Sequence, residues 1–372
     1  MSVPQPPNQW GAQPPAGGPQ WGPPPSGAPQ WVPQGPPPSG GGKGKWIFGG
    51  IALLAVIAVT VVITVLVVGK NSGGSQSPTP TNGNGNGSDF ASANDKGPVG
   101  IITDDPTCAA WNRINNTAVG VQSQVGWRNR DQSAPATAWT AEQRSMYETV
   151  GTAFRDAADQ AVGLLKLTPH RVMRELYEQF IAYSRAFADA IPRYNAEDKE
   201  LGTAPDTIAS TIGSICSAIT AGSASALAPL VPAGSPPSNI ASPQDPADPR
   251  PFIAKRDAVC SEWSSAIPPF AAQTSEWGDI DPALTAAQWT PEQKAVNDAV
   301  GPVMTARADE LVKLGSRSGN PVLQDFADLS AQYLRAFVRA LPTYSGNDSY
   351  IVNTSIYLPL FVDSACQVAS HG

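Results

Sequence analysis

The chain has 372 residues and a formal net charge of −7 at pH 7. This acidic balance, with no basic run in the part expected to fold, excludes nucleic acid and anionic lipid headgroups as partners attracted by charge. The chain has only two histidines, and its four cysteines are never closely spaced, so we expect no metal site. No cofactor-binding motif is present, and we expect no cofactor.

Residues 1–45 form a tail of Pro, Gly, Gln, Ser and Trp that carries no charge before Lys43. Such a segment cannot bury enough apolar surface to offset its chain entropy, so we expect disorder with polyproline-II character. A Gln–Trp pair recurs at Trp10, Trp21 and Trp31, and spaced tryptophans could dock on an aromatic groove of a cytoplasmic protein. A spacer whose repeats arose by slippage explains the same pattern, and composition does not decide between the two.

Residues 46–69 are predicted to form a transmembrane helix. Their apolar run, Trp46 to Val68, contains no charge and at about 1.5 Å per residue is about 34 Å long, enough to cross a bilayer core. A secretory signal peptide is the alternative, but its apolar region would be shorter, nearer the N-terminus and followed by a cleavage site. We therefore expect a retained anchor and a single-pass protein of the cell membrane.

The charges and cysteines around this run predict its orientation. Lys43 and Lys45 precede it and only Lys70 follows closely, which favours a cytoplasmic N-terminus. All four cysteines come later in the chain, where an oxidising exterior would let them pair. We therefore expect the remaining chain to be extracytoplasmic, connected to the span by a flexible stalk over residues 70–97.

The chain after the stalk contains one unit twice. The motif Tyr-x-Arg-Ala-Phe begins at Tyr183 and again at Tyr333, an offset of 150 residues, and Trp-Thr-x-Glu-Gln begins at Trp139 and again at Trp289. We predict two extracytoplasmic helical domains, 98–222 and 250–372, joined by a Pro/Ala/Ser-rich linker without regular structure over 223–249. The polar residues that recur at this offset are Glu142 and Glu292, Asp159 and Asp309, Tyr183 and Tyr333, Arg185 and Arg335, and Tyr194 and Tyr344.

The duplication also predicts the disulfides. Each unit has one cysteine near its start and one near its end, Cys108 and Cys216 in the first and Cys260 and Cys366 in the second. A bridge between units would require two independent domains to lock together. We therefore predict Cys108–Cys216 and Cys260–Cys366, each closing one unit.

Hydrophobic periodicity predicts an all-α fold, with four helices in each unit packed as a small bundle. Thr140 and Thr290 each begin a Thr-x-x-Gln capping box at the start of a helix. Pro192 and Pro342 are expected to end or kink the third helix of each unit. In the second unit we expect the Pro-Pro pair at 268–269 to break the first helix and Pro359 to kink the last one.

The repeated carboxylates permit two interpretations. Glu142/Glu292 and Asp159/Asp309 could be acid–base pairs, as in glycan hydrolysis. The interpretation that we favour is structural: Glu142 complements the dipole of a helix start, and Asp159 pairs with Arg185 between neighbouring helices.

Two further repeated features bear on catalysis. The repeated Tyr183 and Tyr333 follow the apolar stripe of their helix, which is typical of core residues. His170 is replaced by Asn320 in the second unit, which disfavours a histidine-based mechanism.

The layout resembles that of the proline-rich single-pass envelope proteins of actinobacteria, particularly mycobacteria. The PPPSG motif of the tail, the 46–68 span and the Cys-x-x-Trp sites at Cys108 and Cys260 carry the resemblance. It implies a compartment and no particular reaction. We therefore expect a non-enzymatic, membrane-anchored protein that binds a ligand or a protein partner in the cell envelope; an envelope hydrolase with paired carboxylates and a passive scaffold are the alternatives.

Overall fold

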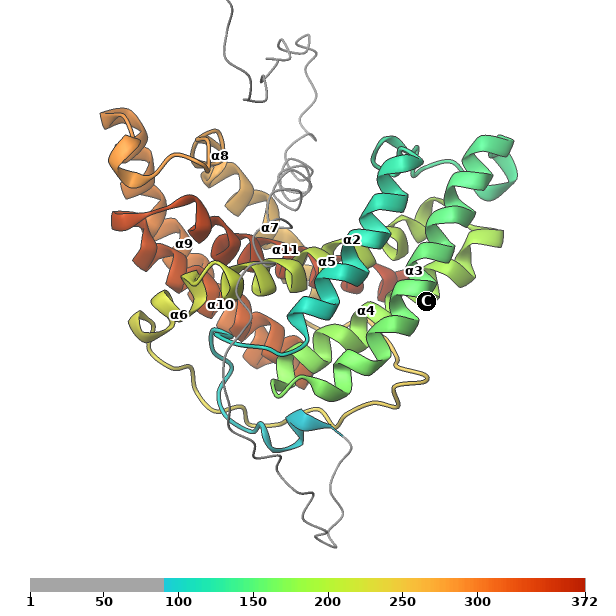
Figure 1. Cartoon of the computed structure of the whole chain (residues 1–372), viewed down its shortest axis with the longest axis horizontal. Coiled ribbons are helices and arrows are strands. Elements are labelled where there is room, and N and C mark those ends of the chain that lie inside the picture. Colours follow the sequence, from blue (N-terminus) through green and yellow to red (C-terminus); the bar gives the residue numbers. More distant parts are fainter. Residues whose placement is uncertain (1–89, 372) are drawn as a thin grey trace, which may run out of the picture. The chain divides into compact units, whose positions relative to one another are not determined.

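A computed structural model describes residues 90–371, which fold into helices and connecting turns with no β-strand among them (Figure 1). The all-α prediction is therefore confirmed for this part of the chain. The predicted tail, the predicted transmembrane helix and most of the predicted stalk lie outside the described residues. Between residues 90 and 371, no helix taken singly combines the length and apolarity of a membrane span, although the bent pair Ala196–Thr220 and Ser223–Leu230 meets that test by length and composition.

Each repeat contains the four long helices expected. In the first they are α2 (Cys108–Gln124), α3 (Ala141–Leu167), α4 (Arg171–Ala190) and α5 (Lys199–Thr220). In the second they are α7 (Cys260–Gln273), α9 (Pro291–Ser318), α10 (Pro321–Ala340) and α11 (Ser349–His371). Two short helices, α6 (Ser223–Leu227) and α8 (Ser275–Gly278), complete the α-helices of the described part (Figure 1).

Short 3-10 turns mark the ends and connections of these helices. They are η1 (Ala91–Asn94), η2 (Trp127–Asn129), η3 (Ala136–Ala138), η4 (Ile191–Arg193), η5 (Ala196–Asp198), η6 (Ala228–Leu230), η7 (Ala286–Gln288), η8 (Leu341–Thr343) and η9 (Gly346–Asp348). Residues 223–230 are thus helical, which differs from the expectation of a linker without regular structure. Leu227 accounts for this difference. Its side chain is buried in the core, and the free energy gained by that burial stabilises a local turn of helix.

Both predicted capping boxes are present. The Thr140 hydroxyl accepts from the Gln143 N–H at 3.2 Å, and the Gln143 side chain accepts from the Thr140 N–H at 2.9 Å. The pair at Thr290 and Gln293 has the same two bonds, at 3.2 and 2.9 Å. These bonds satisfy donors that a helix start would otherwise leave unpaired, and they place the starts of α3 and α9 as the sequence indicates.

The effect of the prolines differs from place to place. As predicted, α4 and α10 end just before Pro192 and Pro342, which fall in the turns η4 and η8. The predicted break at residues 268–269 is wrong, because α7 continues through both prolines to Gln273. Tertiary contacts hold the helix there: the buried Trp263 indole donates to the Pro359 carbonyl of α11 at 2.9 Å, and the neighbouring cysteine is tied to the same helix.

The two disulfides are those predicted, Cys108–Cys216 between α2 and α5 and Cys260–Cys366 between α7 and α11. In each repeat the tryptophan three residues after the first cysteine, Trp111 or Trp263, is fully buried. The bridge therefore closes each four-helix unit from its first helix to its last.

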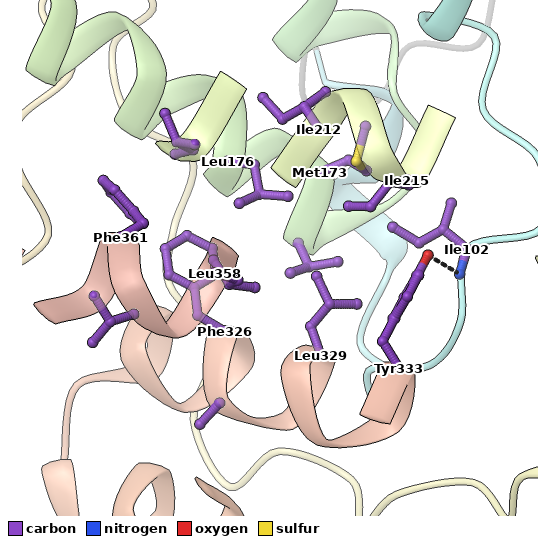
Figure 2. Close-up of a cluster of buried hydrophobic side chains, with 14 of the residues drawn as sticks. Ile102, Met173, Leu176, Ile212, Ile215, Phe326, Leu329, Tyr333, Leu358 and Phe361 are labelled. Carbon is purple, nitrogen blue, oxygen red and sulfur yellow. Dashed lines mark hydrogen bonds between the residues drawn. The ribbon is translucent and has the colours of Figure 1, made fainter. Parts of the chain in front are cut away.

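The two repeats share a core. One continuous cluster of buried side chains includes residues of both, and α5 packs along α11 while α4 contacts α10. Figure 2 shows Met173 and Leu176 of α4 with Ile212 and Ile215 of α5 gathered above Phe326 and Leu329 of α10 and Leu358 and Phe361 of α11. The repeats therefore bury apolar surface against one another, which two independent domains would not do.

Candidate functional site

The repeated acids Glu142 and Asp159 are far apart on one helix. Both belong to α3, 17 residues from each other (159 − 142), which at about 1.5 Å per residue is a separation of about 25 Å along the helix axis. Glu292 and Asp309 have the same separation on α9. Glycoside hydrolysis requires two carboxyl groups roughly 5–10 Å apart. Within a repeat, these acids therefore lack the geometry of an acid–base pair.

The pKa values of Glu142 and Glu292 also disfavour an acid–base role. A hydrogen bond from its own backbone N–H, and then one from the Thr140 hydroxyl, hold the pKa of Glu142 below its usual range. The backbone N–H of Glu292 and then the Thr290 hydroxyl lower the pKa of Glu292 in the same way. A general acid in glycan cleavage needs a raised pKa, because it must hold its proton at neutral pH. Glu142 and Glu292 instead complement the first turns of their helices.

The second pair of positions forms the ion pairs predicted from the sequence. Arg185 donates to Asp159 at 2.8 Å, and Arg335 donates to Asp309 at 2.7 Å, in each case linking the second and third long helices of a repeat. The two aspartate side chains are 60% and 67% exposed, so each pair adds little stability. Arg185 also donates to the carbonyl of Ala247, which ties the linker to α4.

Tyr183 and Tyr333 are buried at equivalent positions of α4 and α10, as predicted for core residues. The Tyr183 ring lies edge-on to Phe361 of the other repeat, with ring centroids 5.3 Å apart. The Tyr333 hydroxyl accepts from the main-chain N–H of Ile102 at 3.3 Å (Figure 2). Burial raises the pKa of both phenols, so neither is suited to deliver a proton near neutral pH.

The most unusual chemistry of the described residues lies where α4 meets α10. Arg171 of α4 forms a two-bond ion pair with Asp325 of α10, with its Nε 2.7 Å from Oδ2 and its Nη2 3.1 Å from Oδ1. The two side chains are only 2% and 1% exposed. Because they come from different repeats, this pair joins the two copies across their shared core.

Further charged groups surround this ion pair. Arg174, also buried, lies 3.4 Å from Glu175 and 3.3 Å from Glu178, all on α4. Asp328, one turn beyond Asp325, is part-buried on α10. We call this group the seam cluster; its members are Arg171, Arg174, Glu175, Glu178, Asp325 and Asp328.

The acids of the seam cluster have unusual proton affinities. Burial, and then the negative charge of Asp325, raise the pKa of Glu175 well above its usual range. The same two causes, burial first, raise the pKa of Asp328 to about 6. Burial also raises the pKa of Glu178, against the opposing effect of Arg174. The cluster contains four carboxyl groups and two guanidinium groups, so it favours retention of protons.

The seam cluster also holds the segment that precedes α2. The Arg171 Nη1 donates to the carbonyls of Asp95 and Gly97, at 2.8 and 3.2 Å, and the Arg171 N–H donates to the Asp95 carboxylate at 2.7 Å. We call residues 95–102 the N-terminal segment. Its attachment to the body thus depends on an arginine that is itself bound to the second repeat.

The linker is held in a similar way. Arg174 donates to the carbonyl of Ala241 at 3.3 Å, and Glu178 accepts from the N–H of Gln244 at 3.0 Å. Next to them, Gln179 donates to the carbonyl of Arg250 at 3.2 Å and accepts from the N–H of Phe252 at 2.9 Å. We call residues 241–252 the linker segment. Buried polar side chains of α4 therefore hold both irregular segments against the body.

Comparison of the repeats by residue identity misses the seam cluster. At the same offset of 150, Glu175 corresponds to Asp325 and Glu178 to Asp328, so each position keeps its charge and changes its residue. A comparison by charge would have identified both positions. Their burial has no such signal in the sequence, because it results from packing between the repeats.

Two surface depressions lie beside the starts of α4 and α10. The larger, about 510 Å³, is lined by residues that include Arg250, Asp257 and Asn320, and the smaller, about 210 Å³, by residues that include Asp95 and His170. Within residues 90–371 no group of three histidine, cysteine, aspartate or glutamate side chains is placed to hold a metal ion.

Comparison with known proteins relates this chain to mycobacterial proteins. Residues 90–370 match the family described as Mycobacterial ESX-1 associated protein, so the match includes both repeats. An uncharacterised protein of Mycolicibacterium smegmatis (strain MKD8) is 45% identical over 339 residues, which cover 91% of this chain and 90% of that protein. No solved structure matches.

Proposed function

The chain belongs to the mycobacterial ESX-1 associated family, and on this premise we propose that it is a secretion-system-associated, membrane-anchored protein that binds a protein partner outside the cell membrane. The observation that carries the proposal is the extent of the family match, which covers the whole described body and both repeats. The body as one piece, rather than a single motif, is therefore the part to which a family role belongs.

One feature supports the extracytoplasmic location of the body, and another concerns the anchor. The body contains two disulfides and no free cysteine among its described residues, which suits an oxidising compartment. The relative from Mycolicibacterium smegmatis aligns over 339 of 372 residues, so the alignment must begin at or before residue 34 and include the apolar run 46–68. The relationship to that protein therefore extends over the predicted anchor of this chain.

The proposal assigns binding rather than catalysis to the body. Its support is the separation of the repeated carboxylates along single helices and the lowered pKa of Glu142 and Glu292. An envelope hydrolase would have to use other groups. A passive scaffold stays as the alternative that the experiment must separate from a binding protein.

The test uses a mycobacterial strain that lacks the chromosomal copy of the protein and carries either the full chain or residues 1–97 alone. The short chain keeps the predicted tail, anchor and stalk and lacks the body, so it controls for partners of the tail. Each chain is tagged and cross-linked in living cells that have or lack the ESX-1 system. A C-terminal alkaline phosphatase fusion to the full chain reports whether the body leaves the cytoplasm.

We expect phosphatase activity, capture of ESX-1 proteins by the full chain only, and reduced release of ESX-1-dependent proteins in the strain without the chain. Capture of the same proteins by residues 1–97 would move the function from the body to the tail. Normal secretion without any ESX-1 protein captured would leave the passive scaffold as the better account. An inactive phosphatase fusion would contradict the proposed topology.

A further inference from the structure

The seam cluster contains more acid than it can balance with base. If its four carboxyl groups were all ionised, its two arginines would leave an excess of two negative charges in a region where Glu175 and Asp325 are fully buried. Burial of unpaired charge is costly, and buried carboxyl groups avoid this cost by retaining a proton. The folded body must therefore carry protons here that its unfolded chain releases.

The charged groups around the seam cluster come from three parts of the chain. α4 contributes Arg171, Arg174 and Glu178, α10 contributes Asp325 and Asp328 with Arg335 near the latter, and the N-terminal segment contributes Asp95. The acids of the neighbouring helices α5 and α11 have hydrogen-bond partners elsewhere. In α5, Glu200 accepts from Ser364, and Asp206 accepts from Gln122 and Trp127. In α11, Asp363 accepts from Ser264 and Gln367. In the linker segment Arg250 pairs with Asp248 on the surface. Arg335, the further cation near Asp328, is already paired with Asp309, so it does not balance the excess acid of the cluster.

We propose that the seam cluster is a proton-operated latch, in which a protonated carboxyl group keeps the N-terminal segment and the linker segment closed on the body, and loss of that proton loosens both segments. The proposal goes beyond the proposed function and does not depend on it.

Competition for Arg171 explains why the N-terminal segment responds. While Glu175 is protonated, Arg171 can serve Asp325 and the carbonyls of Asp95 and Gly97 together. When Glu175 ionises beside Asp325, two buried negative charges compete for the same guanidinium group. The weaker bonds to the carbonyls are then the first to be lost, and these two bonds help to hold the segment.

The linker segment responds through the second arginine. Arg174 lies between Glu175 and Glu178 and also donates to Ala241, while Glu178 accepts from Gln244. An ionised Glu175 draws Arg174 away from the Ala241 carbonyl. Both segments are irregular and lack the backbone hydrogen bonds of a helix, so we expect them to open at a lower free energy than α5 or α11.

The direction of the pH effect follows from the raised pKa values. An unfolded aspartate or glutamate releases its proton near pH 4, whereas the pKa of Asp328 in the folded body is about 6 and that of Glu175 is raised well above its usual range. The folded body therefore binds more protons than the unfolded chain above about pH 4. The latch is closed in mild acid and weakens as the pH rises through the folded pKa values.

The test is hydrogen exchange measured by mass spectrometry on the full chain in detergent micelles, at pH 5.5 and at pH 7.5, with the intrinsic pH dependence of exchange removed. Peptides covering residues 95–102 and 241–252 report the latch, and peptides of α5 report the core. We expect opening of the two segments to increase by up to about tenfold per pH unit for each proton released, with α5 unchanged. Equal protection at both pH values would overturn the proposal, as would loss of protection spread equally over α5.

Two variants and a control make the result specific. Glu175→Gln replaces the acid by a neutral group of the same shape, so its segments should stay protected at both pH values. Asp328→Asn should reduce the response between pH 5.5 and 7.5, and it provides a second reading if the first variant folds poorly. Asp298→Asn removes an exposed acid that pairs with Lys294 outside the cluster, and it should keep the wild-type response. A full wild-type response in both cluster variants would overturn the proposal.

Discussion

Removal of one disulfide tests whether the shared core makes the two repeats unfold together. The perturbation is the double substitution Cys108→Ser and Cys216→Ser, which opens a bridge between residues separated by 108 positions. In the chain-entropy model a loop of this length is worth about 16 cal/mol/K, or about 4.8 kcal/mol at 25 °C. The bridge Cys260–Cys366, with a separation of 106, has nearly the same value of about 4.8 kcal/mol.

The shared core predicts that the two bridges affect the same unfolding transition. Because the core cluster runs through both repeats, opening either bridge should destabilise one common unfolding transition. A chain of this size loses roughly 2 °C of melting temperature per kcal/mol, so either double variant should melt about 10 °C lower than the wild type. Independent repeats would behave differently, since only the repeat with the opened bridge would melt early.

Differential scanning calorimetry of the full chain distinguishes the two cases. We expect one transition in the wild type and one in each double variant, shifted by similar amounts. Two separate transitions, of which only one moves in each variant, would refute the conclusion that the repeats unfold as a unit. A shift below about 2 °C in both variants would refute the entropic magnitude instead.

Two further predictions concern the seam and the packing of the helices, and urea unfolding at pH 7 measures both. Arg171→Met leaves the Asp325 carboxylate buried without its cation and should cost about 3–5 kcal/mol; a loss below about 1 kcal/mol would show that the pair does not hold the repeats together. Gly315→Ala should cost about 1–3 kcal/mol, because the added Cβ would lie 2.6 Å from the Ala327 Cβ where α9 and α10 meet. Its matched control is Gly163→Ala, at an exposed helical position where an added Cβ would have no neighbour within 4 Å. This variant should stabilise the chain by about 0.5–1 kcal/mol, because alanine favours a helix more than glycine does. Equal effects of the two variants would contradict the close packing at Gly315.

Much of this protein could be predicted from its sequence, because the signals are local or repeated. A threonine followed three residues later by a glutamine specifies a helix start through two hydrogen bonds within the same turn, as at Thr140 and Thr290. The duplication selects one cysteine pairing of three, and the structure has that pairing. The recurrence of Arg185 and Arg335 likewise predicted their pairs with Asp159 and Asp309.

The helix of repeat two that contains two adjacent prolines shows where local rules fail. Each proline removes one backbone hydrogen bond, and from the sequence alone this cost ends the helix. In the folded chain the indole of Trp263 and the bridge at Cys260 fix the helix against α11. The balance between that cost and these distant contacts is decided only when α7 and α11 meet.

The seam cluster depends in the same way on tertiary structure. Arg171, Arg174, Glu175 and Glu178 follow one another at helical spacing, a pattern that in an isolated unit is typical of a face exposed to water. The sequence by itself determined the helices, the duplication, the cap positions and the disulfides, because each is written in short spacings or in the repeat. Only the tertiary structure decided that the repeats share a core and that this charged face of α4 is buried between them. The physical reason is that periodicity shows which side of a helix is apolar, but it does not show what packs against the other side.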